Sequence, residues 1–313
     1  MKAFKVRAEV ARLSRLLDVP TEQAAALAEL DADTLRQLRE QATAMLYDAQ
    51  RESLSRVATA TRLLPATLAA MLAERSLGPL LCARIAAYLP DDTAYEIARR
   101  LSDEFLVEVC LQLDPRRAQG VVRKLPAERC TVIGLALVRR REYVTIGSFV
   151  DILDFDVLAT VLAALDDATL LHAGFYAEDR LRLSRIVADL PPARFESLID
   201  AALADDGALW SLALALMADL LPIWQRRFGE CALRRDPGAI SRMLALSDAL
   251  DLWPVLLAIV DPIDDPDCLA RLHDALLDCP PDRLVRLRNA ADGHPTLARL
   301  QALDWPAAVR ALL

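Results

Sequence analysis

The stretch that decides the fold is residues 77–136, which read, in blocks of twelve, LGPLLCARIAAY, LPDDTAYEIARR, LSDEFLVEVCLQ, LDPRRAQGVVRK and LPAERCTVIGLA. Each block opens with a leucine, followed within two places by a turn or cap residue such as Pro90 or Ser102. A β-branched residue stands eight places after each leucine, at Ile85, Ile97, Val109, Val121 and Ile133. The spacing of twelve is therefore a structural repeat.

The length of the repeat predicts short helices. Twelve residues suit about two helical turns and a tight corner, because an α-helix has about 3.6 residues per turn. The apolar positions 6, 9 and 10 of each block are three and four apart, so they share one helix face. A helix of this length is not stable alone in water and has to pack on its neighbours. The pattern is typical of repeat proteins, in which each unit buries its face by stacking.

The repeat continues beyond the five unbroken blocks. It extends to Ala201 if a four-residue insertion at 137–140 and one extra residue, Ala177, are allowed for. We therefore predict an all-α fold, a superhelical α-solenoid of short helical repeats of about twelve residues, with a long amphipathic helix near the N-terminus.

Two of the blocks carry a recognisable motif. Residues 89–98 (LPDDTAYEIA) and 113–122 (LDPRRAQGVV) resemble the cytosolic N-terminal superhelical domain of MgtE-type magnesium transporters, and they are also similar to the helical repeats of the flagellar motor switch protein. The resemblance covers residues 77–201 and implies a fold more than an activity. The chain departs from the transporter family because it has no expected membrane span and no β-α-rich region that would form its paired nucleotide-sensing modules.

The chain is predicted to consist of three parts: residues 1–64, the repeat array at residues 65–203, and residues 208–313. The first part contains no Gly or Pro between Pro20 and Pro65, and its apolar stripe predicts one long helix near 33–63 with a slip at Ser53. We interpret that stripe as the face on which the helix packs against the repeats. The alternative is that the helix forms a dimer interface with a second chain. The break before the third part is residues 204–207, and the third part is expected to contain degenerate helical repeats.

The composition excludes several classes of protein. The formal net charge is −8, which argues against a nucleic-acid binder because phosphate contacts need a basic face. The N-terminus lacks the apolar core of a signal peptide. The most hydrophobic stretch, residues 210–224, is shorter than the roughly 20 residues that span a bilayer. We therefore expect a cytoplasmic protein without membrane insertion.

The candidate metal site is a run of acids after residue 260. Asp264 and Asp265 lie in the sequence DPIDDPD at 261–267, and carboxylate oxygens are the ligands that Mg²⁺ prefers. The alternative interpretation is ordinary cap and turn chemistry, because Asp beside Pro favours turns. Cys268, His273 and Cys279 are a weaker zinc candidate, since their spacing provides neither of the usual ligand pairs.

Two further sets of residues are candidates for binding or catalysis. The run Arg139, Arg140 and Arg141 straddles the end of the four-residue insertion, so it is a candidate contact for an acidic partner, with solvated surface charge as the alternative. His172 and Tyr176 share a helix face, but no nucleophile or pocket can be assigned to them. A polar helix face is the favoured interpretation of this second pair.

No catalytic or phosphate-binding motif occurs in the chain, which has only 9 glycines. The sequence therefore favours a non-enzymatic, cytoplasmic helical-repeat scaffold for protein–protein interaction, because repeat arrays offer long binding surfaces. The partner's identity is open, and so is the choice between a monomer and a dimer through the 33–63 helix. The alternative function is a magnesium-responsive regulatory protein, which rests on the resemblance to the transporter domain alone.

Overall fold

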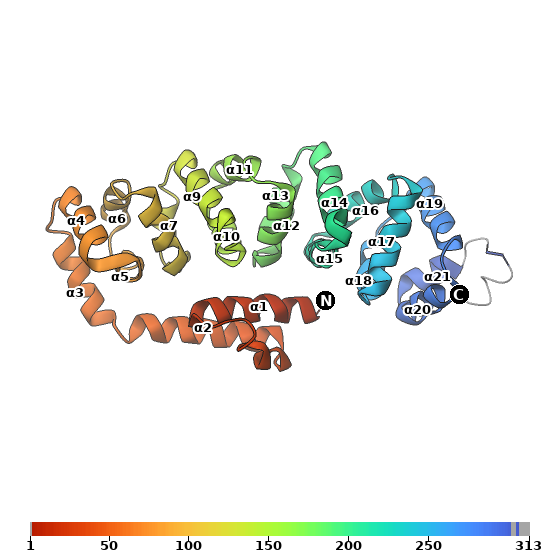
Figure 1. Ribbon diagram of the computed structural model, residues 1–313, viewed down its shortest axis with the longest axis horizontal. Helices are drawn as coiled ribbons and strands as arrows, with labels where there is room; N and C mark the ends of the chain where they lie inside the picture. Colours follow the sequence, from red (N-terminus) through yellow and green to blue (C-terminus); the bar gives the residue numbers. More distant parts are fainter. Residues whose placement is uncertain (1, 302–304, 307–313) are drawn as a thin grey trace. The chain divides into compact units, whose positions relative to one another are not determined.

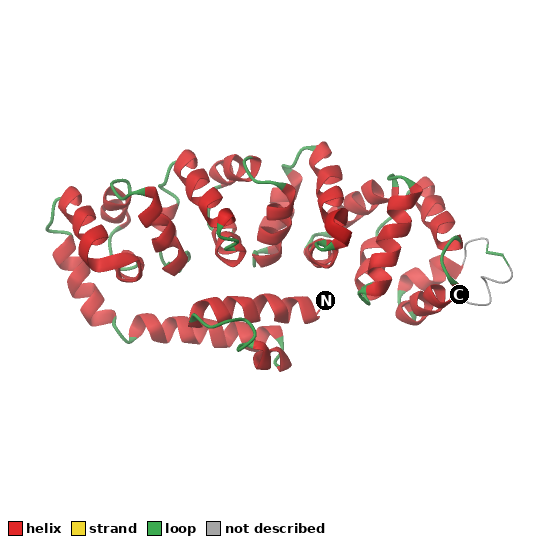
Figure 2. Cartoon of the chain, viewed as in Figure 1, coloured by secondary structure: helices red, strands yellow, loops and turns green. Residues whose placement is uncertain are grey.

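The computed structural model describes residues 2–301, 305 and 306. Helices connected by short loops make up this part of the chain, and no strand occurs in it (Figure 2). The expected all-α fold is confirmed. Within the described ranges, no helix has both the length and the apolar character needed to cross a membrane.

The chain divides into two compact units, the N-terminal unit from Lys2 to Glu178 and the C-terminal unit from Asp179 onward. The expected break at residues 204–207 lies inside the C-terminal unit, where Ala204, Asp205 and Asp206 interrupt α14 (Pro192–Gly207) with non-helical backbone. The turn is present, but α14 packs against α15 (Trp210–Asp219), which follows it. The turn at residues 204–206 therefore changes the direction of the chain without separating two compact units.

The N-terminal unit starts with a helical pair and continues into the array (Figure 1). The helices are α1 (Lys2–Leu17), η1 (Ala25–Glu29), α2 (Ala32–Asp48), α3 (Arg51–Thr61), α4 (Ala66–Leu72), the π-helical turn η2 (Ala73–Leu77), α5 (Gly78–Ala86), α6 (Asp91–Ala98), α7 (Asp103–Gln112), α8 (Gln119–Val122), α9 (Ala127–Arg139), α10 (Tyr143–Val150), α11 (Phe155–Ala163) and α12 (Asp167–Tyr176). Most of the array helices pack on the second helix along the chain: α4 on α6, α5 on α7, α7 on α9, α9 on α11 and α10 on α12.

The buried position of the twelve-residue repeat is confirmed in the five unbroken blocks. The β-branched residue of each block is buried, at Ile85, Ile97, Val109, Val121 and Ile133. The last residue is exposed in three of the blocks, at Arg100, Gln112 and Lys124, and half-buried in the other two, at Tyr88 and Ala136. Ser102 caps α7 by accepting a hydrogen bond from the backbone N–H of Phe105. Spacing and caps thus predicted which face of each short helix is buried.

The single long helix expected near 33–63 is wrong. Two helices, α2 and α3, are separated there by a turn at Ala49 and Gln50. The physical reason is that the two halves pack on different neighbours. Leu35 of α2 joins an apolar cluster with α1, whereas Leu54 of α3 packs with Ile85 of α5. The slip of the apolar stripe at Ser53 marks this change of neighbour.

The C-terminal unit repeats the same packing. Its helices are α13 (Arg180–Ala188), α14, α15, α16 (Pro222–Leu233), α17 (Pro237–Ala249), α18 (Trp253–Val260), α19 (Pro266–Leu277), α20 (Pro281–Ala291) and α21 (Pro295–Gln301). Here α14 packs on α16, α16 on α18, α15 on α17, α17 on α19 and α18 on α20. The end of the expected repeat region, residues 302–304 and 307–313, lies outside the described residues.

Two glycines of the array provide a test of this packing. Gly134 lies in α9 beside an apolar cavity of ≈ 60 Å³, and a Cβ added there would meet Val161 at 3.5 Å, an ordinary contact. A Cβ on Gly147 in α10 would lie 2.6 Å from the Tyr176 backbone. We expect Gly134→Ala to stabilise the chain by about 1 kcal/mol through helix propensity. Gly147→Ala should destabilise it, because overpacking costs about 1–3 kcal/mol.

Chemical denaturation of the two variants measures both effects. Each substitution adds one methyl group inside an array helix, so each is the matched control for the other. Changes of the same sign at both positions would contradict the packing of α10 against the end of α12.

Candidate functional site

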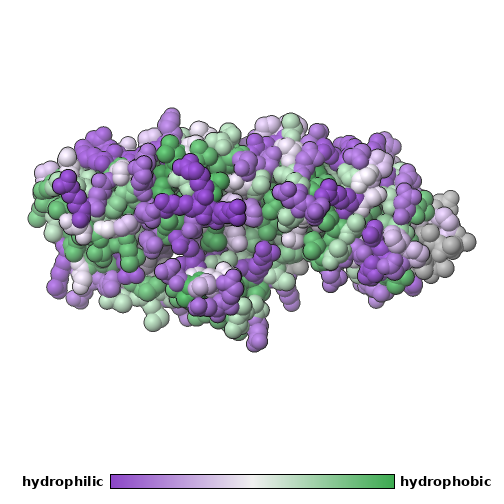
Figure 3. All heavy atoms as spheres, viewed as in Figure 1, coloured by the Kyte–Doolittle hydropathy of each residue, from purple (hydrophilic) through white to green (hydrophobic). Residues whose placement is uncertain are grey.

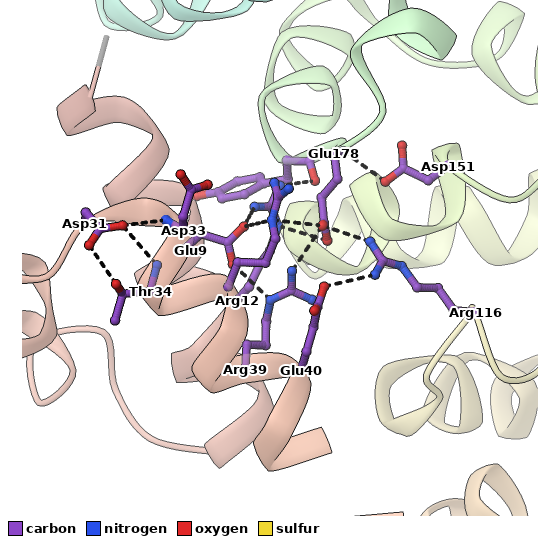
Figure 4. A network of polar contacts seen from close by, with 12 residues as sticks. Glu9, Arg12, Asp31, Asp33, Thr34, Arg39, Glu40, Arg116, Asp151 and Glu178 are labelled. Carbon is purple, nitrogen blue, oxygen red and sulfur yellow. Dashed lines mark hydrogen bonds and ion pairs between the residues drawn. The ribbon is translucent and has the colours of Figure 1, made fainter. Parts of the chain in front are cut away.

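A cluster of acids and arginines lies between the α1–α2 pair and the array within the N-terminal unit (Figure 4). The Glu9 side chain is 2% exposed and the Glu178 side chain 11%. Glu9 oxygens lie 2.5 Å from Arg12, 2.9 Å from Arg39 and 3.6 Å from Arg36. Glu178 oxygens lie 2.8 Å from Arg116, 3.0 Å from Arg39, 3.7 Å from Arg12 and 3.8 Å from Arg36. We call these six residues the acid–arginine cluster.

Local helix geometry places most of the cluster. Glu9 and Arg12 are three residues apart on α1, and Arg36 and Arg39 are three apart on α2, so each pair shares a helix face. Glu178 follows the end of α12, where its backbone N–H donates to Asp151 at 2.9 Å. The helical pair thus presents three guanidiniums to a carboxylate held by the array.

The charges in the cluster are mutually stabilising. Burial raises the pKa of Glu178, but the charges of Arg12, Arg39, Arg116 and Arg36 outweigh it and hold that pKa below its ordinary value. Burial likewise lowers the pKa of Arg39, and its two carboxylate partners more than offset this, so that pKa is raised. Such partly buried pairs hold their charges because the desolvation cost is balanced by several close opposite charges.

Several polar contacts join the α1–α2 pair to the array. Arg12 donates to the Tyr176 carbonyl at 2.8 Å, and Arg15 donates to the Leu111 carbonyl at 2.9 Å. By contrast, the pair has its own small apolar cluster of buried side chains: Val10, Leu13, Ala24 and Leu35. The helical pair therefore has an internal core and is attached to the array by ion pairs and arginine–carbonyl bonds.

A cleft of ≈ 490 Å³ lies along this polar junction. The arginines that line it engage acids of the same unit, including Arg15 with Glu142 at 3.5 Å and Arg117 with Asp114 at 3.4 Å. Arg117 also lies 4.4 Å from the centre of the Tyr47 ring. These charges pair with one another, and the Arg15–Glu142 pair joins α1 to the start of α10.

Exposed apolar side chains form a second feature of the N-terminal unit, which we call the α3–α5 surface. Its members are large side chains on α3, α4, α5 and the α3–α4 turn, each at least 37% exposed: Val57, Leu63, Leu64, Leu68, Met71, Leu72, Leu80 and Leu81. Leu63 is 84% exposed. Figure 3 shows apolar atoms at the surface over α5. Apolar side chains that gather on one surface mark an interaction site more often than single exposed apolar residues do.

The candidate partner residues Arg139, Arg140 and Arg141 lie at the end of α9. The four-residue insertion lengthens this helix by one turn. Arg140 pairs with Glu108 on α7 at 2.5 Å. Arg141 adopts a left-handed backbone (φ 59°), and its N–H donates to the carbonyl of Val138 at the helix end. The run is exposed, and part of it serves as the C-terminal cap of α9.

The candidate metal residues Asp264 and Asp265 contact arginines. Asp264 lies 2.6 Å from Arg226, and Asp265 lies 2.7 Å from Arg234. Asp265 is also the N-cap of α19 and accepts from the N–H of Asp267 at 2.9 Å. The part of the chain that the structure describes contains no group of three or more His, Cys, Asp or Glu side chains that could hold a metal ion.

The other candidates have separate partners. The buried Cys268 thiol donates to the Glu230 carbonyl and the buried Cys279 thiol to that of Ala275. The ring of His273 lies 4.5 Å from that of Trp305. Each of these three side chains therefore contacts a different group of the protein.

His172 is a packing residue. Its ring stacks on that of Tyr143 with centroids 4.2 Å apart. Burial, followed by the nearby charges of Arg7 and Arg141, lowers the pKa of His172. Tyr176 accepts a hydrogen bond from Arg12 through its backbone carbonyl. Of this pair, Tyr176 therefore takes part in the polar junction, whereas His172 packs on Tyr143.

Sequence reasoning missed the acid–arginine cluster. Its one local signal is Glu9, a charged residue on the apolar face of α1 beside Val10 and four residues before Leu13. A buried charge needs partners, but apart from Arg12 the other members of the cluster come from three other segments of the chain. No family model, curated protein or solved structure matches this chain significantly.

Proposed function

We propose that this chain is a non-enzymatic helical-repeat scaffold for protein–protein interaction. The observation that carries this proposal is the α3–α5 surface, where eight large apolar side chains are at least 37% exposed. Burial of apolar surface is the main favourable contribution to protein association. The charged residues of the cleft, by contrast, are engaged with one another, which supports a binding role over a catalytic one.

The partner that best fits the α3–α5 surface is a second copy of the chain. The helices α4 and α5 stand at the first array position, where they pack on η2, α6, α7 and α3. A second copy would offer the same apolar face across a two-fold axis, as in most dimers. Glu52 and Arg56 on α3 are both more than 80% exposed, so opposite charges can meet across such an interface.

Sedimentation at micromolar concentration tests this proposal. We expect a concentration-dependent dimer that the double substitution Leu63→Lys and Leu68→Lys abolishes, because two buried ammonium groups would cost more than the lost apolar contact. Leu250→Lys, at a 48% exposed leucine of the C-terminal unit, is the control and should leave the dimer intact. A wild-type chain that stays monomeric at 100 µM would contradict self-association.

The alternative proposal, a magnesium-responsive regulatory protein, makes a different prediction. A site with a Kd of ~0.1 mM would stabilise the fold by about 2.7 kcal/mol at ~10 mM Mg²⁺. Since Asp264 and Asp265 already contact Arg226 and Arg234, we expect no specific rise in melting temperature at constant ionic strength. A rise of several degrees that disappears in the Asp264→Asn, Asp265→Asn variant would favour magnesium sensing over the scaffold function.

A further inference from the structure

A groove of ≈ 490 Å³ lies between α14 and α16 in the C-terminal unit. We call it the Arg227 groove. Three arginines and three acids contribute to its lining: Arg227, Arg234, Arg235, Glu196, Glu230 and Asp236. The formal charges of these side chains cancel, so any ligand is selected by the local arrangement of charges and not by the net charge of the groove.

Arg227 differs from the arginines next to it. Arg226 pairs with Glu230 at 2.7 Å, and Arg234 pairs with Asp265 at 2.7 Å. Arg235 pairs with Asp200. For Arg227, no carboxylate partner is found among the described residues; its contacts are with aromatic rings. Its guanidinium is therefore an available cation in a groove whose other arginines are engaged.

The aromatic rings hold the Arg227 guanidinium in place. Its central carbon lies 4.7 Å from the centroid of the Phe195 ring and 5.6 Å from that of Trp224. Phe195 is 2% exposed and packs on the Phe228 ring at 4.4 Å, so this platform is part of the core. Stacking uses the face of a guanidinium and leaves its N–H edge free for a planar, two-oxygen acceptor.

Exposed apolar side chains occur on α16 and on the segments next to it. Ile223 precedes Arg227 by four residues on α16, so the two share a helix face. Ile223 is 65% exposed, Leu221 is 44% exposed, and Leu181 on α13, which packs on α16, is 71% exposed. A protein segment bound along α16 would contact the Ile223 side chain and, one helical turn later, the Arg227 guanidinium.

We propose that the Arg227 groove binds an acidic, amphipathic segment of a partner protein, with a Glu or Asp carboxylate on the Arg227 guanidinium and a large apolar side chain on Ile223. A carboxylate matches the charge of one free guanidinium, and the two can form a bidentate pair. A phosphate dianion matches less well, because Glu196 and Glu230 line the same groove. This site is independent of the α3–α5 surface and of self-association.

Fluorescence anisotropy with a synthetic helical peptide tests the proposal. The probe carries Leu and Glu four residues apart in an Ala/Gln background, and the matched control peptide has Gln in place of each Glu. We expect wild-type protein to bind the Glu peptide about 10-fold or more tightly than the Gln peptide, as for a charge-assisted hydrogen-bonded pair. Arg227→Ala should remove this preference, and Arg227→Lys should retain only part of it because lysine lacks the planar fork.

Two further variants separate binding from folding. Arg242→Ala, an exposed arginine of the same unit that lies 3.6 Å from Asp206, should leave the affinity unchanged. Ile223→Glu should weaken the binding of the Glu peptide. The helicity and the melting temperature of the protein should not change, since Ile223 is already exposed. Equal binding of the two peptides to wild type, no binding of either, or an unchanged Glu/Gln preference in Arg227→Ala would overturn the proposal. Tighter binding of a phosphoserine peptide than of the Glu peptide would overturn the carboxylate assignment.

Discussion

Replacing Glu9 with alanine is expected to lower the free energy of unfolding of the N-terminal unit by about 3–5 kcal/mol, the usual cost of removing one partner from a buried ion pair. The Glu9 side chain is 2% exposed, and its partners Arg12 and Arg39 are 10% and 14% exposed. Without Glu9, two buried guanidiniums depend on Glu178 alone. Chemical denaturation followed by helicity measures the loss.

The control for Glu9→Ala is Glu96→Ala. Glu96 also contacts two arginines, Arg99 and Arg100, but its side chain is 44% exposed. Exposed pairs of this kind contribute little, so the change should stay within about 0.5 kcal/mol. Similar losses for the two variants would show that burial of the acid–arginine cluster does not contribute to stability.

The cluster should also make stability depend on pH. The arginines lower the pKa of Glu178 in the folded state, so this carboxylate contributes stability above its unfolded pKa of about 4.3. That contribution is lost as the pH falls through the lower, folded pKa. The Glu178→Gln variant should therefore show a smaller loss of stability between pH 5 and pH 3, a range chosen around that value.

Replacing Trp253 with alanine is expected to cost about 3–5 kcal/mol, the range for large aromatic-to-alanine changes in cores. Trp253 is 2% exposed and belongs to the main apolar cluster of the C-terminal unit. Its indole N–H donates to Asp248 at 3.0 Å. Hydrogen bonds from Arg286, and then from Trp253 and Arg283, hold the pKa of Asp248 well below its ordinary value against the effect of burial.

Trp253→Phe separates the two contributions, because phenylalanine keeps most of the apolar volume and removes the N–H donor. Asp248 would retain its bonds to Arg286 and Arg283, so we expect a loss of about 1–3 kcal/mol, smaller than that of Trp253→Ala. Ile223→Ala, at a 65% exposed position, is the control and should change stability by less than about 0.5 kcal/mol. Equal losses for Trp253→Ala and Ile223→Ala would contradict the assigned core.

The 33–63 segment shows where pattern reasoning from sequence reaches its limit. Its apolar stripe and its lack of Gly and Pro are compatible with one continuous helix, and helix propensity alone favours that result. The chain instead turns at Ala49 and Gln50, because Leu35 and Leu54 pack on different helices. Tertiary packing outweighs local propensity here, and the only local trace of it is the slip at Ser53.

The candidate sites show the same division. Asp265 is an N-cap, as the cap and turn interpretation of that loop predicts, and Arg140 and Arg141 lie on the lengthened end of α9. These are local properties, set by residues within a few places in the chain. The acid–arginine cluster joins Glu9 to Glu178, and the Arg227 groove joins α14 to α16. Apart from the Glu9–Arg12 pair on α1, the partners in these sites lie on segments far apart in the sequence.

The sequence alone predicts the all-α class and the buried β-branched position of each of the five unbroken blocks. Periodicity carries this information because residues three and four apart share a face, whatever covers that face. The tertiary packing sets which helix covers which face and brings Glu9 and Glu178 to the same arginines. It also places Arg227 on Phe195 with no carboxylate partner among the residues that the structure describes. A charged or apolar side chain specifies the chemistry of its partner, while the stacking of the helices specifies which residue that partner is.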